Sequence, residues 1–388
     1  MRFTKSSSQA FLLFLAAALA ALLTYQSKQE GASDREEAAN TTLAERVARD
    51  IAGNVIVDFH QQFSNSTLAL LQSSQGFCAN INEVNYQEVQ SHWRDAMSDW
   101  QAVNLINFGP IKEDNKSWRL QFWPDKKNLV GKKIKSLLKT QKELDLKTIR
   151  EASVVIQGLS GLEYLLFDAK GGQLERYENS PVGQRQCKLL LTTATLTHTI
   201  AKELSQSWQS DSEYIRSFLH PNTPMETNTG VDIEATPPLT LILESVLANL
   251  ETLKNSKLGA PLGLNTARQT PNPYLVEAWR SGFSLSLIQA NIEASQQILI
   301  NGELLGFTDY LIANKQDQLA SDIVMSLENI SQQLQLVKPP LAEAISNEGD
   351  IKHLILANEE LVKLIGILKR EVPKALGLTL GFNDNDGD

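Results

Sequence analysis

The residues whose types could carry chemistry lie closest together in the segment GLSGLEYLLFD, residues 158–168. One interpretation is a serine hydrolase turn, because Ser160 follows the apolar run SVVIQ, as a nucleophile follows a strand in the G-x-S-x-G motif. However, Gly161 comes one position early for that motif, and Leu162 stands where a small residue is needed. The other interpretation, which these departures favour, is a helix that carries one carboxylate, Glu163, toward an interior site.

As a helix, the segment places Glu163 at the margin of an apolar stripe made by Val155, Leu159, Leu162 and Leu166. A glutamate at the rim of a helix face, in contact with water, is the alternative. Gly158 and Gly161 would each cost a helix up to about 1 kcal/mol. Their presence therefore indicates a close approach of another segment or a break in the helix.

Other sets of metal-binding residues are sparse in this sequence. The five histidines show no i, i+4 pair and no HExxH motif, so a zinc peptidase of that type has no support. The C-terminal FNDNDGD lacks the final glutamate of an EF-hand loop and is interpreted as a polar tail.

The N-terminus predicts export to the periplasm. Arg2 and Lys5 precede the apolar run AFLLFLAAALAALL, residues 10–23, which is typical of a signal peptide over residues 1–25. A membrane-spanning helix needs about 20 apolar residues, so stable membrane insertion is not expected, although an uncleaved anchor is the alternative. Residues 26–40 are polar and are interpreted as a linker.

Composition and charge narrow the classes of partner. The chain is 42% hydrophobic and 21% charged, as in globular proteins, and its net charge of −9 predicts no nucleic-acid partner. Only Cys78 and Cys187 are present, and in an oxidising compartment we expect them to form a disulfide. Two separate buried thiols are the alternative.

The elements that must position Glu163 are predicted to be helices throughout. Apolar residues follow helical spacing, so the fold class is all-α, with two helical-bundle domains at 41–210 and 236–388 and a proline-bearing linker at 211–235. The segment AWRSGFSLSLIQANI weakly matches HWRDAMSDWQAVNLI, which suggests a duplication. The stretch 115–133 is expected to be an ordered loop, and the helices are expected at 41–72, 85–106, 146–167, 182–208, 239–253, 273–301, 317–336 and 351–372.

Five ordered blocks of the sequence resemble the imelysin-like family, which includes iron-regulated protein A. The blocks are HWRDAMSDWQAVNLINFGPI, RLQFWPDKKN, VIQGLSGLEYLLF, KLGAPLGL and LGLTLGFNDNDGD. The resemblance implies an exported all-helical protein with a cleft between two bundles. Its GxHxxE signature aligns with Gly158 and Glu163, but Ser160 replaces the histidine, and Asn104 replaces a glutamate that follows a tryptophan in the family.

The resemblance implies a role in the uptake or handling of iron or another divalent metal at the cell envelope, together with an envelope protein partner. Glu163 is the one metal ligand that it suggests, and Ser160 weakens such a site because a hydroxyl is a poor ligand for a transition metal. We expect a binding protein whose cleft holds a metal ion or a small ligand. The residues expected at the ligand are Gly158, Ser160, Glu163, Asp125, Arg94, Arg119 and Arg280.

A hydrolase is the alternative function, since the family was named as a peptidase. It would use Ser160 or a metal-bound water, but no complete catalytic set can be assembled from the sequence. If Glu163 faces the cleft, a buried carboxylate needs a partner, and Arg119, Lys126 and Lys127 in RLQFWPDKKN are the expected source.

Overall fold

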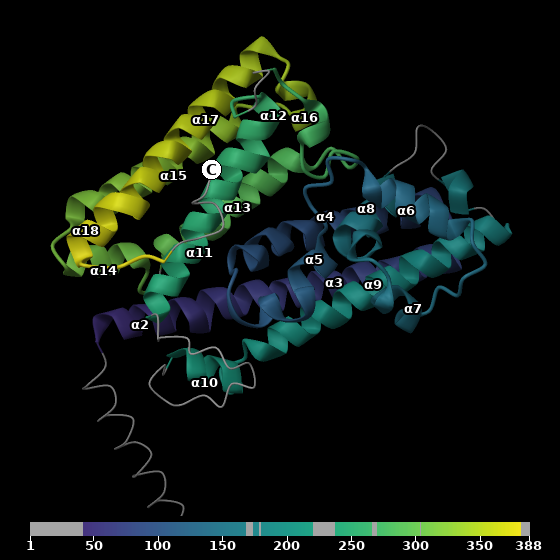
Figure 1. Cartoon of the computed structure of the whole chain (residues 1–388), viewed down its shortest axis with the longest axis horizontal. Coiled ribbons are helices and arrows are strands. Elements are labelled where there is room, and N and C mark those ends of the chain that lie inside the picture. The colour runs from purple at the N-terminus through teal and green to yellow at the C-terminus, as the bar shows by residue number, and fades with distance from the viewer. Residues whose placement is uncertain are drawn as a thin grey trace, which may run out of the picture. The chain divides into compact units, whose positions relative to one another are not determined.

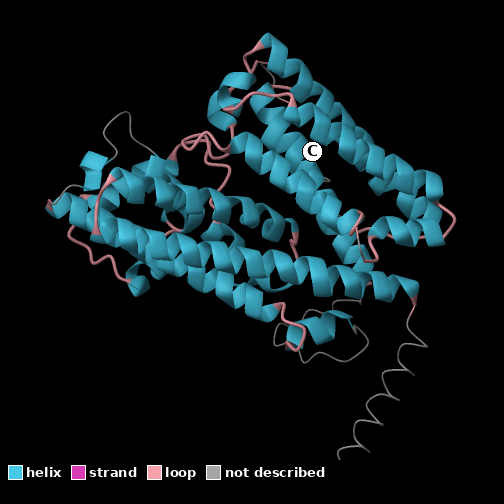
Figure 2. Ribbon diagram, turned by 180° about the vertical axis from the view of Figure 1, so that it is seen from behind, coloured by secondary structure: helices cyan, strands magenta, loops and turns pink. Residues whose placement is uncertain are grey.

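The computed structural model describes residues 42–167, 174–177, 180–219, 237–265, 270–302 and 304–381. The predicted signal peptide, the linker 26–40 and residues 220–235 of the predicted inter-domain linker lie outside these ranges. The described part is helical and contains no strand, as the sequence predicts (Figure 2). Residues Val47–Asp388 form one compact unit. The division into two bundle domains stays a prediction.

Three long helices build the first half of this unit (Figure 1). The expected N-terminal helix comprises α2 (Leu43–Asp50), a π-helical segment (Ile51–Ile56) and α3 (Val57–Ala79). Helix α3 packs against α4 (Glu83–Leu105) and α9 (Pro181–Ser207). The core between them is aromatic, with Phe63, Phe77, Trp93 and Trp100 almost completely buried. A disulfide joins Cys78 at the end of α3 to Cys187 in α9.

The segment between α4 and α9 differs from the sequence prediction in two places. The expected loop 115–133 contains α5 (Lys116–Leu120) and the start of α6 (Leu129–Leu138), a short helix that buries Val130 and Ile134. The expected single helix 146–167 is split into α7 (Leu146–Glu151), a 3-10 turn (Val154–Ile156) and α8 (Gly158–Phe167). The break falls before Gly158, where the backbone has a φ of +63° that no helix continues through.

The second half repeats the helical pattern. Short helix α10 (Glu213–Leu219) follows α9, and α11 (Pro238–Thr252) continues through a π-helical segment (Leu253–Gly259) into α12 (Ala260–Leu262). The helix expected at 273–301 begins only at Ser284, because Ala278 and Gly282 both have positive φ and turn the chain. The remaining helices are α13 (Ser284–Leu299), α14 (Phe307–Ala313), α15 (Asp317–Gln335), α16 (Leu341–Ala344), α17 (Glu348–Gly366) and α18 (Val372–Leu376), with a π-helical segment (Ile367–Glu371) before α18.

Helix α4 connects the two halves of the compact unit, because α11 and α13 of the second half pack against it. Buried polar contacts fix this packing. Gln101 Oε1 in α4 accepts hydrogen bonds from Lys257 Nζ at 2.6 Å and from Asn291 Nδ2 at 3.0 Å. Beyond the end of α4, the backbone N–H of Asn107 donates to Ser245 Oγ at 3.0 Å. The residues near these contacts form the walls of the candidate site.

Candidate functional site

Helix α8 confirms the helical interpretation of residues 158–168 for the part that the structure describes. It begins at Gly158, where an added Cβ would lie 2.2 Å from the backbone oxygen of Leu120 and 2.3 Å from that of Arg119. Trp93 Nε1 in α4 donates to the carbonyl of Leu159 at 3.0 Å. The glycine therefore allows the C-terminal end of α5 to pass against the first turn of α8.

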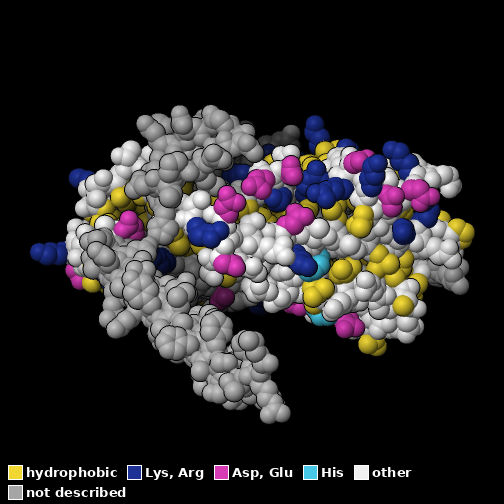
Figure 3. Space-filling view, turned by 90° about the horizontal axis from the view of Figure 1, so that it is seen from below, with side chains coloured by type: hydrophobic (Ala, Val, Ile, Leu, Met, Phe, Trp, Pro, Cys, Tyr) yellow, Lys and Arg dark blue, Asp and Glu magenta, His cyan; other side chains and the backbone are white. Residues whose placement is uncertain are grey.

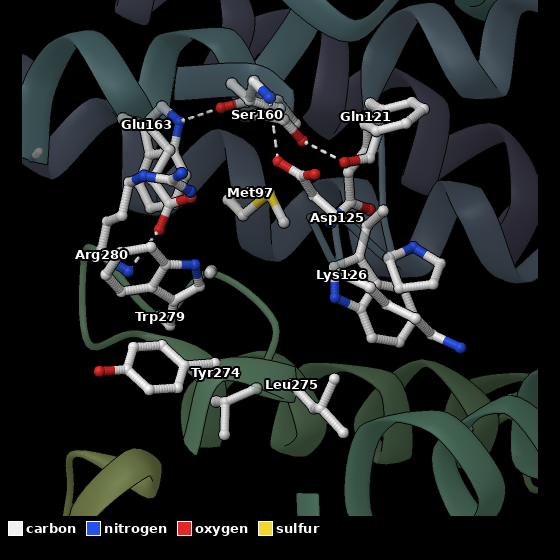
Figure 4. A pocket seen from close by; sticks show the side chains of 18 residues that line it. Met97, Gln121, Asp125, Lys126, Ser160, Glu163, Tyr274, Leu275, Trp279 and Arg280 are labelled. Atoms are coloured by element: carbon white, nitrogen blue, oxygen red, sulfur yellow. Dashed lines mark hydrogen bonds and ion pairs between the residues drawn. The ribbon is translucent and has the colours of Figure 1, made fainter. Parts of the chain in front are cut away.

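Glu163 in α8 is buried rather than at the rim, with 5% of its surface exposed. Its Oε1 accepts hydrogen bonds from the backbone N–H groups of Arg280 and Ser281, at 3.1 Å and 3.0 Å, and from Ser281 Oγ at 3.2 Å. Its Oε2 lies 3.6 Å from Arg280 Nη1. Figure 4 shows the two side chains meeting at one side of the pocket. The carboxylate thus holds the loop that precedes α13.

Burial raises the pKa of Glu163, while the charge of Arg280 and the donors of Ser281 oppose the rise. The partner of Glu163 is Arg280, so the expectation that RLQFWPDKKN supplies the partner is wrong. Arg280 is itself tightly placed. Its guanidinium lies 4.4 Å from the ring centroid of Trp279, and Nη2 donates to Asn128 Oδ1 at 2.6 Å.

Four of the residues expected at the ligand line one small pocket: Asp125, Ser160, Glu163 and Arg280 (Figure 4). Its volume of about 30 Å³ has room for about one water molecule. Asp125 accepts from the backbone N–H groups of Leu129 and Val130, at 2.7 Å and 3.0 Å, so it caps the start of α6. The Ser160 hydroxyl donates to the carbonyl of Phe122 at 3.1 Å, whereas a nucleophilic serine donates to a general base.

Two of the expected residues lie apart from this pocket. Arg94 lies over the ring of Phe167 at 5.1 Å, and burial lowers its pKa. Arg119 donates to the backbone carbonyls of Asp114 and Arg150, each at 2.8 Å. Gly158 shapes the site through the backbone and has no side chain to contribute. The geometry therefore gives Arg94 and Arg119 packing roles within the described residues.

A larger groove adjoins the small pocket and shares Gln121, Trp123 and Pro124 with it. The groove has a volume of about 1150 Å³ and is lined by residues of both halves of the chain. Its wall contains a buried ion pair, in which Lys257 Nζ lies 2.9 Å from Glu277 Oε2. We define the polar wall of the groove as Gln121, Lys257 and Glu277.

The three residues of the polar wall are connected by the ion pair and by a hydrogen bond between Gln121 and Glu277. Gln121 Oε1 accepts from Trp100 Nε1, and Gln121 Nε2 donates to Glu277 Oε1, both at 2.7 Å. Lys257 Nζ also donates to Gln101, as described above. Sequence reasoning missed this network, although Lys257 opens the block KLGAPLGL and Glu277 directly precedes AWRSGF. The sequence signal that could have indicated the network is a charged residue at the edge of each of two distinctive blocks.

The donor set does not fit a directly bound metal ion. The described residues contain no group of three or more His, Cys, Asp or Glu side chains that could hold one. Both oxygens of Glu163 face donors or the Arg280 cation, so a second cation there would compete with an arginine that is already in place. The suggestion that Glu163 is a metal ligand therefore gains no support from its surroundings.

The fold and the site together define an all-helical protein with a groove between the two halves of one compact unit. The sequence of residues 56–367 matches the family described as Imelysin. The chain belongs to the imelysin family. No curated protein sequence matches it significantly.

Two solved structures share the fold. An imelysin-like protein from Psychrobacter arcticum 273-4 superimposes with a TM-score of 0.72 at 19% identity, covering 88% of this chain and 99% of that one. A proposed iron-regulated protein A precursor from Parabacteroides distasonis ATCC 8503 has a TM-score of 0.64 at 18% identity, covering 84% and 93%. Within the described part, no helix combines the length and apolar character needed to cross a membrane.

Proposed function

We propose that this imelysin-family protein is an exported binding protein that takes part in iron handling at the cell envelope. We further propose that it holds the metal as an anionic chelate in the groove beside the polar wall. Family membership and the N-terminal sequence pattern support the general role. The solved relative described as an iron-regulated protein A precursor supports the connection with iron.

The choice of ligand rests on the charged residues that line the groove. Both acidic residues that line it already have partners: Glu277 contacts Lys257 and Gln121, and Glu244 Oε1 accepts from the backbone N–H of Gly381 at 2.5 Å. Lys112 lines the same groove, is exposed, and makes no hydrogen bond or ion pair with any described residue. The charge of Glu277 is offset by Lys257, whereas Glu244 keeps its charge beside the Gly381 N–H. The free cation of Lys112 is therefore the group through which the groove would attract an anionic ligand.

The size and side-chain types of the groove support the same ligand class. A volume of about 1150 Å³ is in the range of small-molecule sites and far exceeds what one metal ion fills. Trp118 and Trp123 offer aromatic surface, and Asn104 offers an amide that makes no hydrogen bond with a described residue. Polycarboxylate complexes of ferric iron combine negative charge with hydrogen-bond acceptors. They would contact these groups of the groove, and the iron would need no carboxylate ligand from the protein.

In this proposal the small pocket has a positioning role. Glu163, Arg280, Ser160 and Asp125 hold the segments that form one end of the groove, and they do not contact the iron. The hydrolase alternative gains no specific support, because the Ser160 hydroxyl already donates to the carbonyl of Phe122.

Isothermal titration of the purified full chain with ferric citrate, citrate alone and ferrous ion tests the proposal. We expect saturable binding of ferric citrate, weakened by Lys112→Gln by roughly 2- to 5-fold, as loss of one exposed ion pair implies. Lys352→Gln, at an exposed position on α17, is the matched control and should bind like the wild type. Stoichiometric iron that survives dialysis against a chelator, with no binding of the complex, would contradict the proposal.

A further inference from the structure

The segment that carries α6 has a charge opposite to that of the whole chain. Residues 126–142 read KKNLVGKKIKSLLKTQK, with seven lysines and no acidic residue, although the net charge of the chain is −9. We call these seven lysines the basic face. Each of them is exposed. Figure 3 shows dark blue Lys and Arg side chains toward the right of the drawn surface, with magenta Asp and Glu side chains among them, at the end where α6 and α7 lie in Figure 1.

Helix α6 explains why the lysines point outward. Val130, Gly131 and Ile134 are buried, and α6 packs against α8 through this side, so Lys132, Lys133 and Lys135 remain on the exposed side. Because the opposite side of the helix is buried, these three lysines lie together on the exposed side. Their charges take no part in packing the helix.

The basic face is not neutralised by the rest of the described chain. None of its lysines forms an ion pair with a described carboxylate. The hydrogen bonds that their side chains donate go to neutral groups. Lys132 Nζ donates to the carbonyl of Lys127 at 2.9 Å, and Lys133 Nζ donates to Ser153 Oγ at 3.1 Å. Like charges brought together without partners repel one another. The arrangement is therefore complementary to an external anionic surface.

We propose that the basic face docks the protein on the surface of a membrane that contains anionic phospholipids. Three observations favour a lipid surface over a discrete anion site. The cations are lysines spread over a helix and the segments before and after it, whereas discrete phosphate sites favour the bidentate fork of arginine. Of the seven lysines only Lys126 lines one of the two pockets described above, and that pocket has room for about one water molecule.

The third observation is exposed apolar surface at the same end of the molecule. Leu146 at the start of α7 and Val182 at the start of α9 are 49% and 62% exposed. Arg185, one turn after Val182, donates to the carbonyl of Lys142 at 3.0 Å, so the start of α9 adjoins the basic face. Apolar side chains beside lysines suit the boundary between headgroups and acyl chains. The protein would then rest on the lipid surface without spanning it.

Vesicle sedimentation of the full chain at low ionic strength tests the proposal, with phosphatidylcholine vesicles and with vesicles in which roughly one third of the lipid is phosphatidylglycerol. Binding to the neutral vesicles measures the contribution of apolar surface, both from the apolar run at residues 10–23 and from Leu146 and Val182. The proposal concerns the increment that phosphatidylglycerol adds. We expect this increment to be large and to disappear at high salt, because screening weakens exposed charges.

The decisive variant is Lys135→Gln/Lys139→Gln/Lys142→Gln, since these three side chains make no hydrogen bond or ion pair with a described residue. Loss of three lysines near an anionic surface should weaken the increment roughly 100-fold. The matched control, Lys338→Gln/Lys352→Gln/Lys374→Gln, removes the same charge from exposed positions elsewhere and should bind like the wild type. Circular dichroism should show both variants folded.

Three outcomes would overturn the proposal. The first is the absence of an increment with phosphatidylglycerol. The second is an equal loss in both triple variants, which would show that net charge alone matters. The third is displacement by inorganic phosphate at constant ionic strength, which would identify a discrete anion site in place of a lipid surface.

Discussion

Arg280→Met tests the role that the structure gives to the contact between Arg280 and Glu163. Both side chains are almost fully buried, at 5% and 6% exposed, and Nη1 lies 3.6 Å from Oε2. Coulomb's law with an effective dielectric constant of about 20 gives roughly 4–5 kcal/mol at that distance. Removal of one partner of a buried pair costs about 3–5 kcal/mol. We therefore expect the free energy of unfolding to fall by about 3–5 kcal/mol at neutral pH.

The pH dependence separates charge from packing. Burial already raises the pKa of Glu163, so its contribution to stability is present below the ordinary carboxyl pKa and is lost as pH rises through the folded pKa. Arg280 opposes that rise, so its removal raises the pKa of Glu163 further. The loss of stability in Arg280→Met should consequently be large near pH 7.5 and become smaller as pH falls, because Glu163 is protonated at a higher pH in the variant than in the wild type.

Urea denaturation followed by tryptophan fluorescence measures both quantities. Glu163→Gln/Arg280→Met should recover most of the loss at neutral pH, because the penalty comes from an unpaired buried carboxylate. Lys363→Met removes the cation of a more exposed pair, in which Lys363 Nζ lies 3.7 Å from Glu360 Oε2 and the side chains are 51% and 28% exposed, and should cost at most about 1 kcal/mol. Equal losses at both pH values, or no recovery in the double variant, would refute the charge-pair reasoning.

Three further predictions concern other parts of the structure. Burial lowers the pKa of His60 to about 4 from its ordinary 6.5, so its contribution is present above pH 6.5 and lost as pH falls. The wild type should lose about 2 kcal/mol more than His60→Gln between pH 7.5 and pH 5 in urea titrations. Gly158→Ala should cost roughly 3 kcal/mol or more because of its φ of +63° and the Leu120 oxygen, whereas Gly76→Ala, with open space, should gain up to about 1 kcal/mol in the same assay. A fluorophosphonate probe should leave Ser160 unlabelled, and labelling of the wild type but not of Ser160→Ala would support the hydrolase alternative.

Local sequence patterns predicted the helices well where a helix is long and has one buried side. The predicted helix 85–106 is α4 (Glu83–Leu105), and the predicted helix 182–208 is α9 (Pro181–Ser207). The predictions failed where the backbone leaves helical geometry at a single position. Ala278, with a φ of +46°, is such a position. Its turn could not be predicted, because alanine is not a residue type that indicates a turn.

Contacts between distant segments explain most of what the sequence did not reveal about the site. Glu163 was identified, and so was its need for a partner, but Arg280 lies 117 residues further along the chain. Helical periodicity tells which side of a helix is buried and does not tell which other segment covers it. Arg280 was among the residues expected at the cleft, yet nothing local linked it to Glu163 in place of Arg119 or Lys126.

The two buried charge pairs act on the same short segment, residues 277–281. Glu277 at its start is held by Lys257 and Gln121, and Glu163 holds the backbone at its end, through Arg280 and Ser281. Each pair has a desolvation cost that a well-packed apolar pair would avoid, so stability alone does not account for them. Directional bonds at both ends fix the position of the segment in a way that apolar contacts do not. Since Glu277 lines the groove, the pairs act together to hold one wall of the proposed ligand site in place.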